Sequence, residues 1–213
     1  MRLFTPALAT ALMLAGCAGK TPEPAWKANA AGALASFSDA YLKGDTRVAD
    51  AEFRRARSEM SSTGRFDLVA HAELYRCATE VAALASNACP GFDALAQDAT
   101  AAERTYAAYL AGQWDGIDPT QLPEQHRAVV APGDAPKLAA IGDPLSRQVA
   151  AGALMHAERI TPADIATATE TASQQGWRRP LLTWLGVSLK RAQAAGDDAE
   201  AARIMRRIEL ASR

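Results

Sequence analysis

About one residue in four is alanine, and this composition limits the chain to folds built from closely packed helices. Residues that favour strands, such as Val, Ile, Tyr and Phe, are sparse, whereas alanine has the highest helix propensity. Small alanine faces also let neighbouring helix axes approach each other. The sequence therefore predicts an all-α fold, either antiparallel helical hairpins or an irregular α-bundle.

Helical periodicity begins at Trp26, where apolar residues follow at spacings of four, four, three and four and so share one helical face. Gly44 supplies a helix stop, Asp45 an N-cap for a second helix, and Gly64 the end of that helix. The two helices should form a hairpin. Its apolar stripes are Trp26, Ala30, Leu34, Phe37 and Tyr41, followed by Ala49, Phe53, Ala56 and Met60.

Capping residues predict the remaining helices. The third should run toward the mid-eighties, and the last should carry Ala201, Ile204, Met205 and Ile208 beyond Gly196. The predicted starts are Asp67, Thr100 with Glu103, Asp143 with Pro144, Thr161 with Pro162 and Asp164, and Pro180.

The segment 112–144 differs from the rest because it carries several glycines and prolines around a short apolar run. We expect irregular chain there with one or two short helices. The helical domain should span 26–213, and if it has two subdomains their boundary falls within 112–144.

Two of the predicted hairpins resemble the tetratricopeptide unit in their second helices. Ala49, Phe53 and Ala56 follow the first turn, and Ala201, Met205 and Ile208 follow the last one. The resemblance implies stacked hairpins with a concave binding face. The first helices lack the family's full pattern and no 34-residue period links the copies, so any alanine-rich antiparallel pair remains an alternative.

The N-terminus carries a secretory pattern: Arg2, then a short apolar stretch from Leu3 to Met13, then small residues. Leu14-Ala15-Gly16-Cys17 resembles the lipobox of bacterial lipoprotein precursors. As a whole, the chain also resembles small alanine-rich lipoproteins of proteobacteria, a similarity that carries no activity. An ordinary signal peptide or a retained N-terminal helix is the alternative.

The lipoprotein resemblance implies that 1–16 is a signal peptide and that Cys17 becomes an acylated N-terminal residue. Two or more acyl chains, at about 0.8 kcal/mol per buried methylene, anchor a protein stably to a membrane. Ala18 takes the position where the family places an aspartate for inner-membrane retention, which favours the periplasmic face of the outer membrane. Residues 17–25, with two prolines, should form a lipidated tether with a reach of roughly 25 Å.

Charge and motifs exclude several function classes. Without 1–16 the chain has 22 basic residues (23 minus Arg2) against 24 acidic ones, so its net charge is −2 and nucleic acid is not an expected partner. No contiguous catalytic, nucleotide or zinc signature is present, and we expect no catalytic residue, cofactor or metal ligand. His71 with Glu73, and His156 with Glu158, are only two apart and do not face each other on a helix.

Cys77 and Cys89 are the remaining cysteines. In an exported chain this pair predicts a disulfide, with metal binding as the rival interpretation. Twelve residues of continuous helix would separate their Cα atoms by roughly 18 Å, too far for a bond. The helix that carries Cys77 must therefore end before Cys89, with the chain folding back near Pro90-Gly91.

Trp177, Arg178 and Arg179 stand out because two cations lie at or before a helix N-terminus, where acidic groups are favoured. They predict a small site for an anion or an acidic partner. The alternative is that Trp177 packs against Leu181 while the arginines pair with nearby acids.

We expect a membrane-anchored periplasmic lipoprotein whose helical body binds or scaffolds an envelope protein complex, without nucleic acid. An envelope enzyme or a cell-wall-binding protein with a non-contiguous site is the alternative. An apolar groove would favour the first function, and a deep cleft with paired carboxylates would favour the second.

Overall fold

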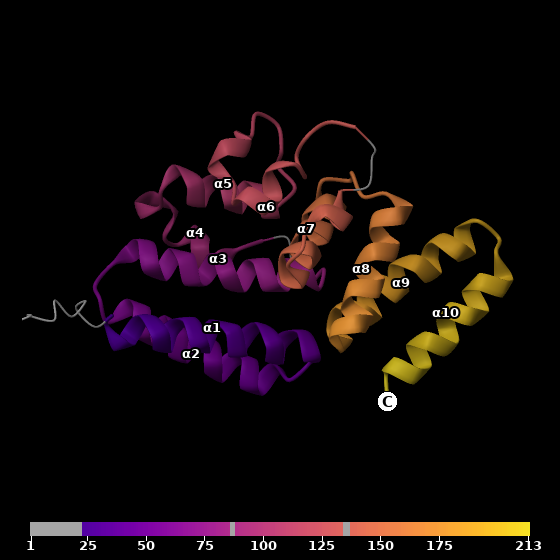
Figure 1. Cartoon of the computed structure of the whole chain (residues 1–213), viewed down its shortest axis with the longest axis horizontal. Helices are drawn as coiled ribbons and strands as arrows, with labels where there is room; N and C mark the ends of the chain where they lie inside the picture. The colour runs from indigo at the N-terminus through magenta and orange to yellow at the C-terminus, as the bar shows by residue number, and fades with distance from the viewer. Residues whose placement is uncertain (1–22, 86–87, 134–136) are drawn as a thin grey trace, which may run out of the picture.

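The computed structural model describes residues 23–85, 88–133 and 137–213, which form ten α-helices, three short 3₁₀ helices and no strand. The predicted all-α class is confirmed. Figure 1 shows an elongated array with the α1–α2 hairpin and the adjacent α3 at one end, the α9–α10 hairpin at the other, and α7 and α8 between them. The helices are α1 Ala25–Lys43, α2 Thr46–Ser61, α3 Phe66–Ala82, α4 Pro90–Asp93, α5 Ala101–Leu110, α6 Glu124–Arg127, α7 Pro144–His156, α8 Pro162–Gln175, α9 Arg178–Ala194 and α10 Asp198–Ala211.

The α1–α2 hairpin forms as its turn residues predict. Gly44 adopts the left-handed conformation (φ 98°) and its N–H donates to the carbonyls of the last turn of α1. The carboxylate of Asp45 accepts from the N–H of Val48 at 3.1 Å, which caps α2. The apolar stripes meet, with the rings of Phe37 and Phe53 at a centroid distance of 5.3 Å.

The third helix begins one residue earlier than its predicted cap. α3 starts at Phe66 with Arg65 at the N-cap position, so the prediction of Asp67 as a cap is wrong. Asp67 instead lies in the first turn, where the helix dipole stabilises a negative charge. Its carboxylate pairs with the guanidinium of Arg65.

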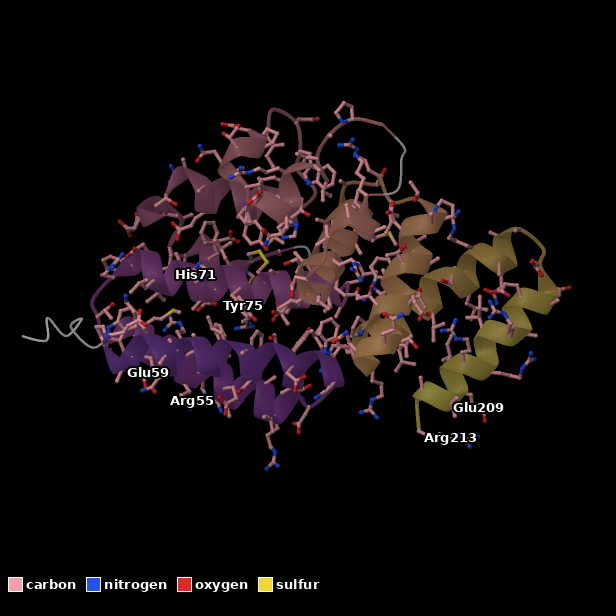
Figure 2. The ribbon with its side chains drawn as sticks, in the orientation of Figure 1. Arg55, Glu59, His71, Tyr75, Glu209 and Arg213 are labelled. Atoms are coloured by element: carbon pink, nitrogen blue, oxygen red, sulfur yellow. A yellow bond between two sulfur atoms is a disulfide. The ribbon has the colours of Figure 1, made fainter. Side chains whose placement is uncertain are left out.

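α3 ends at Ala82, and the chain then returns alongside it. This return brings the Cα atoms of Cys77 and Cys89 to 5.5 Å, and the two side chains form the predicted disulfide, drawn as a yellow bond in Figure 2. The geometric requirement for a break in the helix is therefore met.

The segment after the disulfide covers one face of α3. Thr100 and Glu103 form the predicted capping box at the start of α5. Within 112–144 the described chain contains only short elements: α6 and the 3₁₀ helices Pro119–Gln121 and Leu138–Ala140. Leu122 and Val129 from this segment join one buried cluster with residues of α3, α7 and α9.

A buried polar chain joins α7, α8 and α9. The amide of Gln148 donates to the carbonyl of Ala168 at 2.6 Å and accepts from the indole of Trp184 at 2.9 Å. Gln148 and Trp184 are both fully buried, so each satisfies the polar group of the other. The predicted caps Asp143 and Thr161 start α7 and α8.

The C-terminal hairpin departs from the prediction in two ways. α9 begins at Arg178 rather than at Pro180, which occupies the third helical position. Met205, expected on the apolar stripe of α10, is 50% exposed, whereas Ala201 and Ile204 are buried. The reason is that α10 packs against α9, and Met205 lies on a side of α10 that this contact leaves exposed.

α3 and α7 cross at very short range. A Cβ atom added to Gly152 would lie 2.2 Å from the carbonyl oxygen of Val81. The neighbours Ala150, Ala151 and Ala153 are fully buried. Because only small residues permit this separation, the crossing is specified by the side-chain sizes on α7.

No helix in the described part of the chain combines the length and the apolar character that crossing a bilayer requires.

Gly152→Ala should lower the free energy of unfolding by about 1 to 3 kcal/mol, because the new methyl group overlaps the backbone of Val81. Gly186→Ala is the matched control, since Gly186 lies in α9 with open space around it. That control should be neutral or stabilising by up to about 1 kcal/mol. Urea denaturation followed by circular dichroism measures both, and equal stabilities of the two variants would contradict the close crossing.

Candidate functional site

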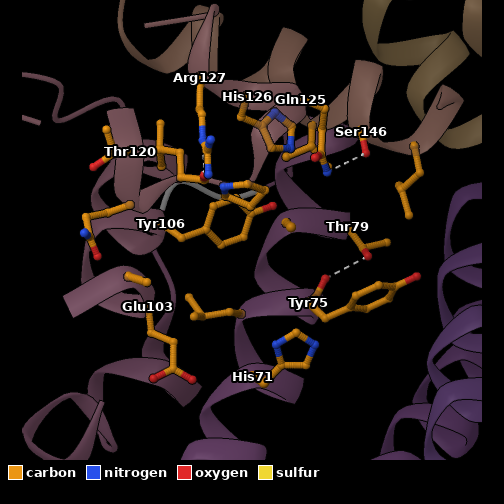
Figure 3. Close-up of a pocket in the computed structure, with 18 residues that line it drawn as sticks. His71, Tyr75, Thr79, Glu103, Tyr106, Thr120, Gln125, His126, Arg127 and Ser146 are labelled. Atoms are coloured by element: carbon orange, nitrogen blue, oxygen red, sulfur yellow. Dashed lines mark hydrogen bonds between the residues drawn. The ribbon is translucent and has the colours of Figure 1, made fainter. Parts of the chain in front are cut away.

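A cavity of about 520 Å³ opens between α3, α5, α6 and α7 and is the best candidate for a binding site (Figure 3). This volume lies in the range of ligand pockets. Its walls are mainly apolar, with a polar mouth. The apolar lining includes Leu74, Ala78, Ala102, Leu122, Pro123, Leu145 and Val149, and the polar lining includes His71, Glu103, Thr120, Gln121, Gln125, Arg127 and Ser146.

Tyr106 and His126 lie on the inner wall, and Tyr109 and Trp114, which are not part of the lining, support them. The hydroxyl of Tyr109 lies 3.1 Å from Nδ1 of His126, and both residues are buried. Trp114 stacks on Tyr109 with an interplanar angle of 5°, and its indole N–H donates to the Tyr109 carbonyl. Tyr106 lies against His126, with a centroid distance of 5.9 Å. These contacts hold the imidazole in one orientation.

Burial fixes the protonation of this wall. It lowers the pKa of His126 to about 4, an effect that the negative charge of Asp143 opposes. Burial also raises the pKa of Tyr109 well above its ordinary value. The imidazole is therefore neutral near pH 7. Among the described residues the protonated Tyr109 hydroxyl makes no hydrogen bond other than the one to Nδ1 of His126, so it donates to that nitrogen. The imidazole proton then resides on Nε2.

Polar contacts brace the mouth of the cavity. The amide of Gln125 donates to the hydroxyl of Ser146 at 3.4 Å, which connects α6 to α7. Tyr75 shares a hydrogen bond of 3.0 Å with Ser38, which connects α3 to α1. Burial raises the pKa of Tyr75, so its hydroxyl also stays protonated. The cavity is thus fixed to the N-terminal hairpin through α3.

The lining contains a single carboxylate, and that carboxylate has a structural role. Glu103 accepts from the backbone N–H and the hydroxyl of Thr100 at 2.7 and 2.9 Å in the capping box. Arg127 donates through Nε to the carbonyl of Leu122 at 3.0 Å. A pair of facing carboxylates, which most glycoside hydrolases use, is not part of this lining.

The histidine and glutamate pairs identified in the sequence separate in the structure. His71 lies exposed at the mouth of the cavity, whereas Glu73 is buried and pairs with Arg57 of α2 at 2.7 Å. Nδ1 of His156 lies 2.8 Å from the carbonyl oxygen of Leu110. Within the described ranges, no three His, Cys, Asp or Glu residues gather closely enough to hold a metal ion.

The other predicted site residues that the structure describes, from Cys77 and Cys89 to Trp177, Arg178 and Arg179, are not part of the cavity lining. Cys17 and the lipobox fall outside the described residues. Trp177 is the N-cap residue of α9 and packs against the main buried cluster.

Arg179 joins the start of α9 to the turn after α1. Its Nε donates to the carbonyl of Tyr41 at 2.7 Å and its Nη2 to the hydroxyl of Thr46 at 2.8 Å. The guanidinium also lies 4.2 Å from the ring centroid of Tyr41. Arg178 is exposed beside Gly44. These partners carry no net charge, and an anion site at Arg178 and Arg179 stays a prediction.

Sequence reasoning missed the cavity. Tyr106 and Tyr109 have the helical spacing that predicts one face of α5, but His126 follows Pro123 in a segment expected to be irregular. The available signal was the combination of a histidine with a short apolar run in that proline-rich segment, which indicates burial.

Comparison of the chain with known protein families, with characterised proteins and with solved structures finds no match.

The depressed pKa of His126 predicts a loss of stability in mild acid. The unfolded state takes up the proton near its ordinary pKa of about 6.5 and the folded state only near 4, so the free energy of unfolding falls as the pH drops through this window. The loss should be on the order of 3 kcal/mol. His126→Gln, which does not titrate, is the control, and its unfolding free energy should change less between pH 7 and pH 4. Identical pH profiles of the two proteins, measured by urea denaturation, would refute this assignment.

Proposed function

We propose that the protein is a membrane-anchored periplasmic lipoprotein whose helical body binds or scaffolds an envelope protein complex, with the α3–α5–α6–α7 cavity as the contact point. The observation that supports the binding role is the cavity itself. It is mainly apolar, it is open at the surface, and its lining has a single carboxylate, which is held in a capping box. Such a lining favours binding over hydrolysis.

The anchor rests on the lipobox Leu14-Ala15-Gly16-Cys17 and on the short apolar stretch before it. The tether that follows would keep the helical body close to the lipid surface. Because acyl chains supply the membrane affinity, the body needs no membrane-spanning helix for attachment. In the lipoprotein family that the lipobox resembles, an aspartate after the cysteine signals retention at the inner membrane. This chain has Ala18 at that position, which favours the outer membrane.

Intact mass spectrometry of protein from the native envelope tests the anchor. We expect a polypeptide that begins at Cys17 and carries acyl chains. Cys17→Ser should keep the soluble fold, measured by circular dichroism, but move the protein out of the detergent-extracted membrane fraction. A wild-type product that retains residues 1–16, or that begins elsewhere without acyl chains, would contradict the lipoprotein assignment.

Site-specific photocrosslinking in the native envelope tests the contact point. A benzoylphenylalanine placed at Gln125, an exposed residue of the cavity mouth, should give one discrete protein adduct. The control position is Glu209 on α10, which Figure 2 shows at the opposite end of the molecule from His71 and Tyr75.

A second pair of variants separates binding in the cavity from incidental contact. Ala102→Trp should fill the mouth and remove the Gln125 adduct, because Ala102 is exposed and lines the cavity. Ala101→Trp, at the neighbouring exposed residue outside the lining, should leave the adduct in place. If crosslinking at Gln125 recovers only cell-wall fragments, the wall-binding alternative is favoured and the scaffolding function is rejected.

A further inference from the structure

Two polar groups on the inner wall of the cavity have no partner among the described residues. His126 is 2% exposed, and its Nε2 makes no hydrogen bond within the described chain. Among the described residues, every fully buried side-chain nitrogen or oxygen has a hydrogen-bond partner. Because Nε2 of His126 has none, it must lie on the small solvent-accessible part of the imidazole, and this residue lines the cavity. The same reasoning places the hydroxyl of Tyr106 at an accessible position.

Both groups act as neutral donors. The hydroxyl of Tyr109 donates to Nδ1 of His126, which leaves the imidazole proton on Nε2. Burial raises the pKa of Tyr106, so its hydroxyl keeps its proton. Figure 3 shows Tyr106 and His126 side by side on the cavity wall. A ligand in the cavity therefore meets one donor, Nε2–H, and one hydroxyl that can donate, and an acceptor on the ligand satisfies both groups.

The charges around the cavity do not favour an ion. The lining has one formal negative charge, on Glu103, and one formal positive charge, on Arg127. Each is already engaged, with Thr100 and with the carbonyl of Leu122 respectively. The remaining walls are aliphatic and aromatic, and transfer of an ion to such surroundings is costly.

We propose that the cavity accepts an uncharged aromatic group with a neighbouring carbonyl, whose oxygen accepts hydrogen bonds from His126 Nε2 and Tyr106 Oη. This inference rests on the proposed binding function and names the chemistry that the same site recognises. On an envelope partner, the matching element is an aromatic side chain with an adjacent peptide carbonyl in an uncharged segment. A cavity of about 520 Å³ has room for such a group.

The first test uses a fluorescent probe of this chemistry, 6-propionyl-2-(dimethylamino)naphthalene, titrated with the purified full-length protein. Its emission should shift to the blue on binding, because the apolar walls replace water. The analogue with a propyl group in place of the propionyl ketone is the matched ligand control. The ketone should bind about tenfold more tightly than the alkyl analogue, as expected for one or two hydrogen bonds in a buried site.

Variants then assign the preference to the two donors. The His126 variants are made in a Tyr109→Phe background. Without this change, removal of the imidazole would leave the buried hydroxyl of Tyr109 without an acceptor. Adding His126→Leu should bring the two ligands to within about twofold of each other, whereas adding His126→Gln, whose amide N–H can replace Nε2–H, should keep the preference. Tyr106→Phe in the wild-type background should lower the preference for the ketone over the alkyl analogue about threefold. This single variant tests the inference if the double variants do not fold.

Competition connects the probe to a peptide partner. N-acetylphenylalaninamide should displace the probe, and the charged N-acetylphenylalanine should displace it at least about fivefold less well. Equal affinity for the ketone and the alkyl analogue, or a ketone preference that is unchanged both by His126→Leu in the Tyr109→Phe background and by Tyr106→Phe, would overturn the inference. If the probe does not bind but the photocrosslinked adduct at Gln125 is still found, only the proposed ligand chemistry is rejected. If no adduct forms at Gln125, the proposed function is rejected.

Discussion

The close crossing of α3 and α7 is the constraint on which the rest of the structure depends. Gly152 lets the two backbones meet at Val81, and the buried alanines beside it keep this separation along the crossing. α7 then carries Gln148, which joins α8 and α9, while α3 carries the disulfide and the contacts to the first hairpin. A larger side chain at the crossing would displace all of these contacts together.

The cavity is a consequence of this arrangement. α3 and α7 supply two of its walls, and α5 and α6 close the third side through Tyr106 and His126. The chain places a histidine among aromatic rings, which suppresses its charge and leaves it a neutral hydrogen-bond donor. An apolar space with neutral donors selects ligands by shape and acceptor position rather than by charge.

Local signals in the sequence predicted most helix boundaries, because capping residues and glycines act within a few residues of themselves. Gly44, Asp45 and the Thr100–Glu103 pair behave as expected. Asp67 does not, since α3 begins one residue before it, and Met205 is exposed because its burial depends on which side of α10 packs against α9. The cavity escaped prediction because its walls combine segments between 71 and 149 that meet only through tertiary packing.

The contact between Arg179 and Tyr41 joins residues 138 positions apart. A ribosome releases the chain from its N-terminus, so the first hairpin emerges long before the guanidinium that bonds to the end of its first helix. During that interval the carbonyl of Tyr41 lacks its Arg179 donor, which is supplied only when α9 has been made. A chain that stops before Arg179 would therefore lack the contacts that join the start of α9 to the end of the first helix.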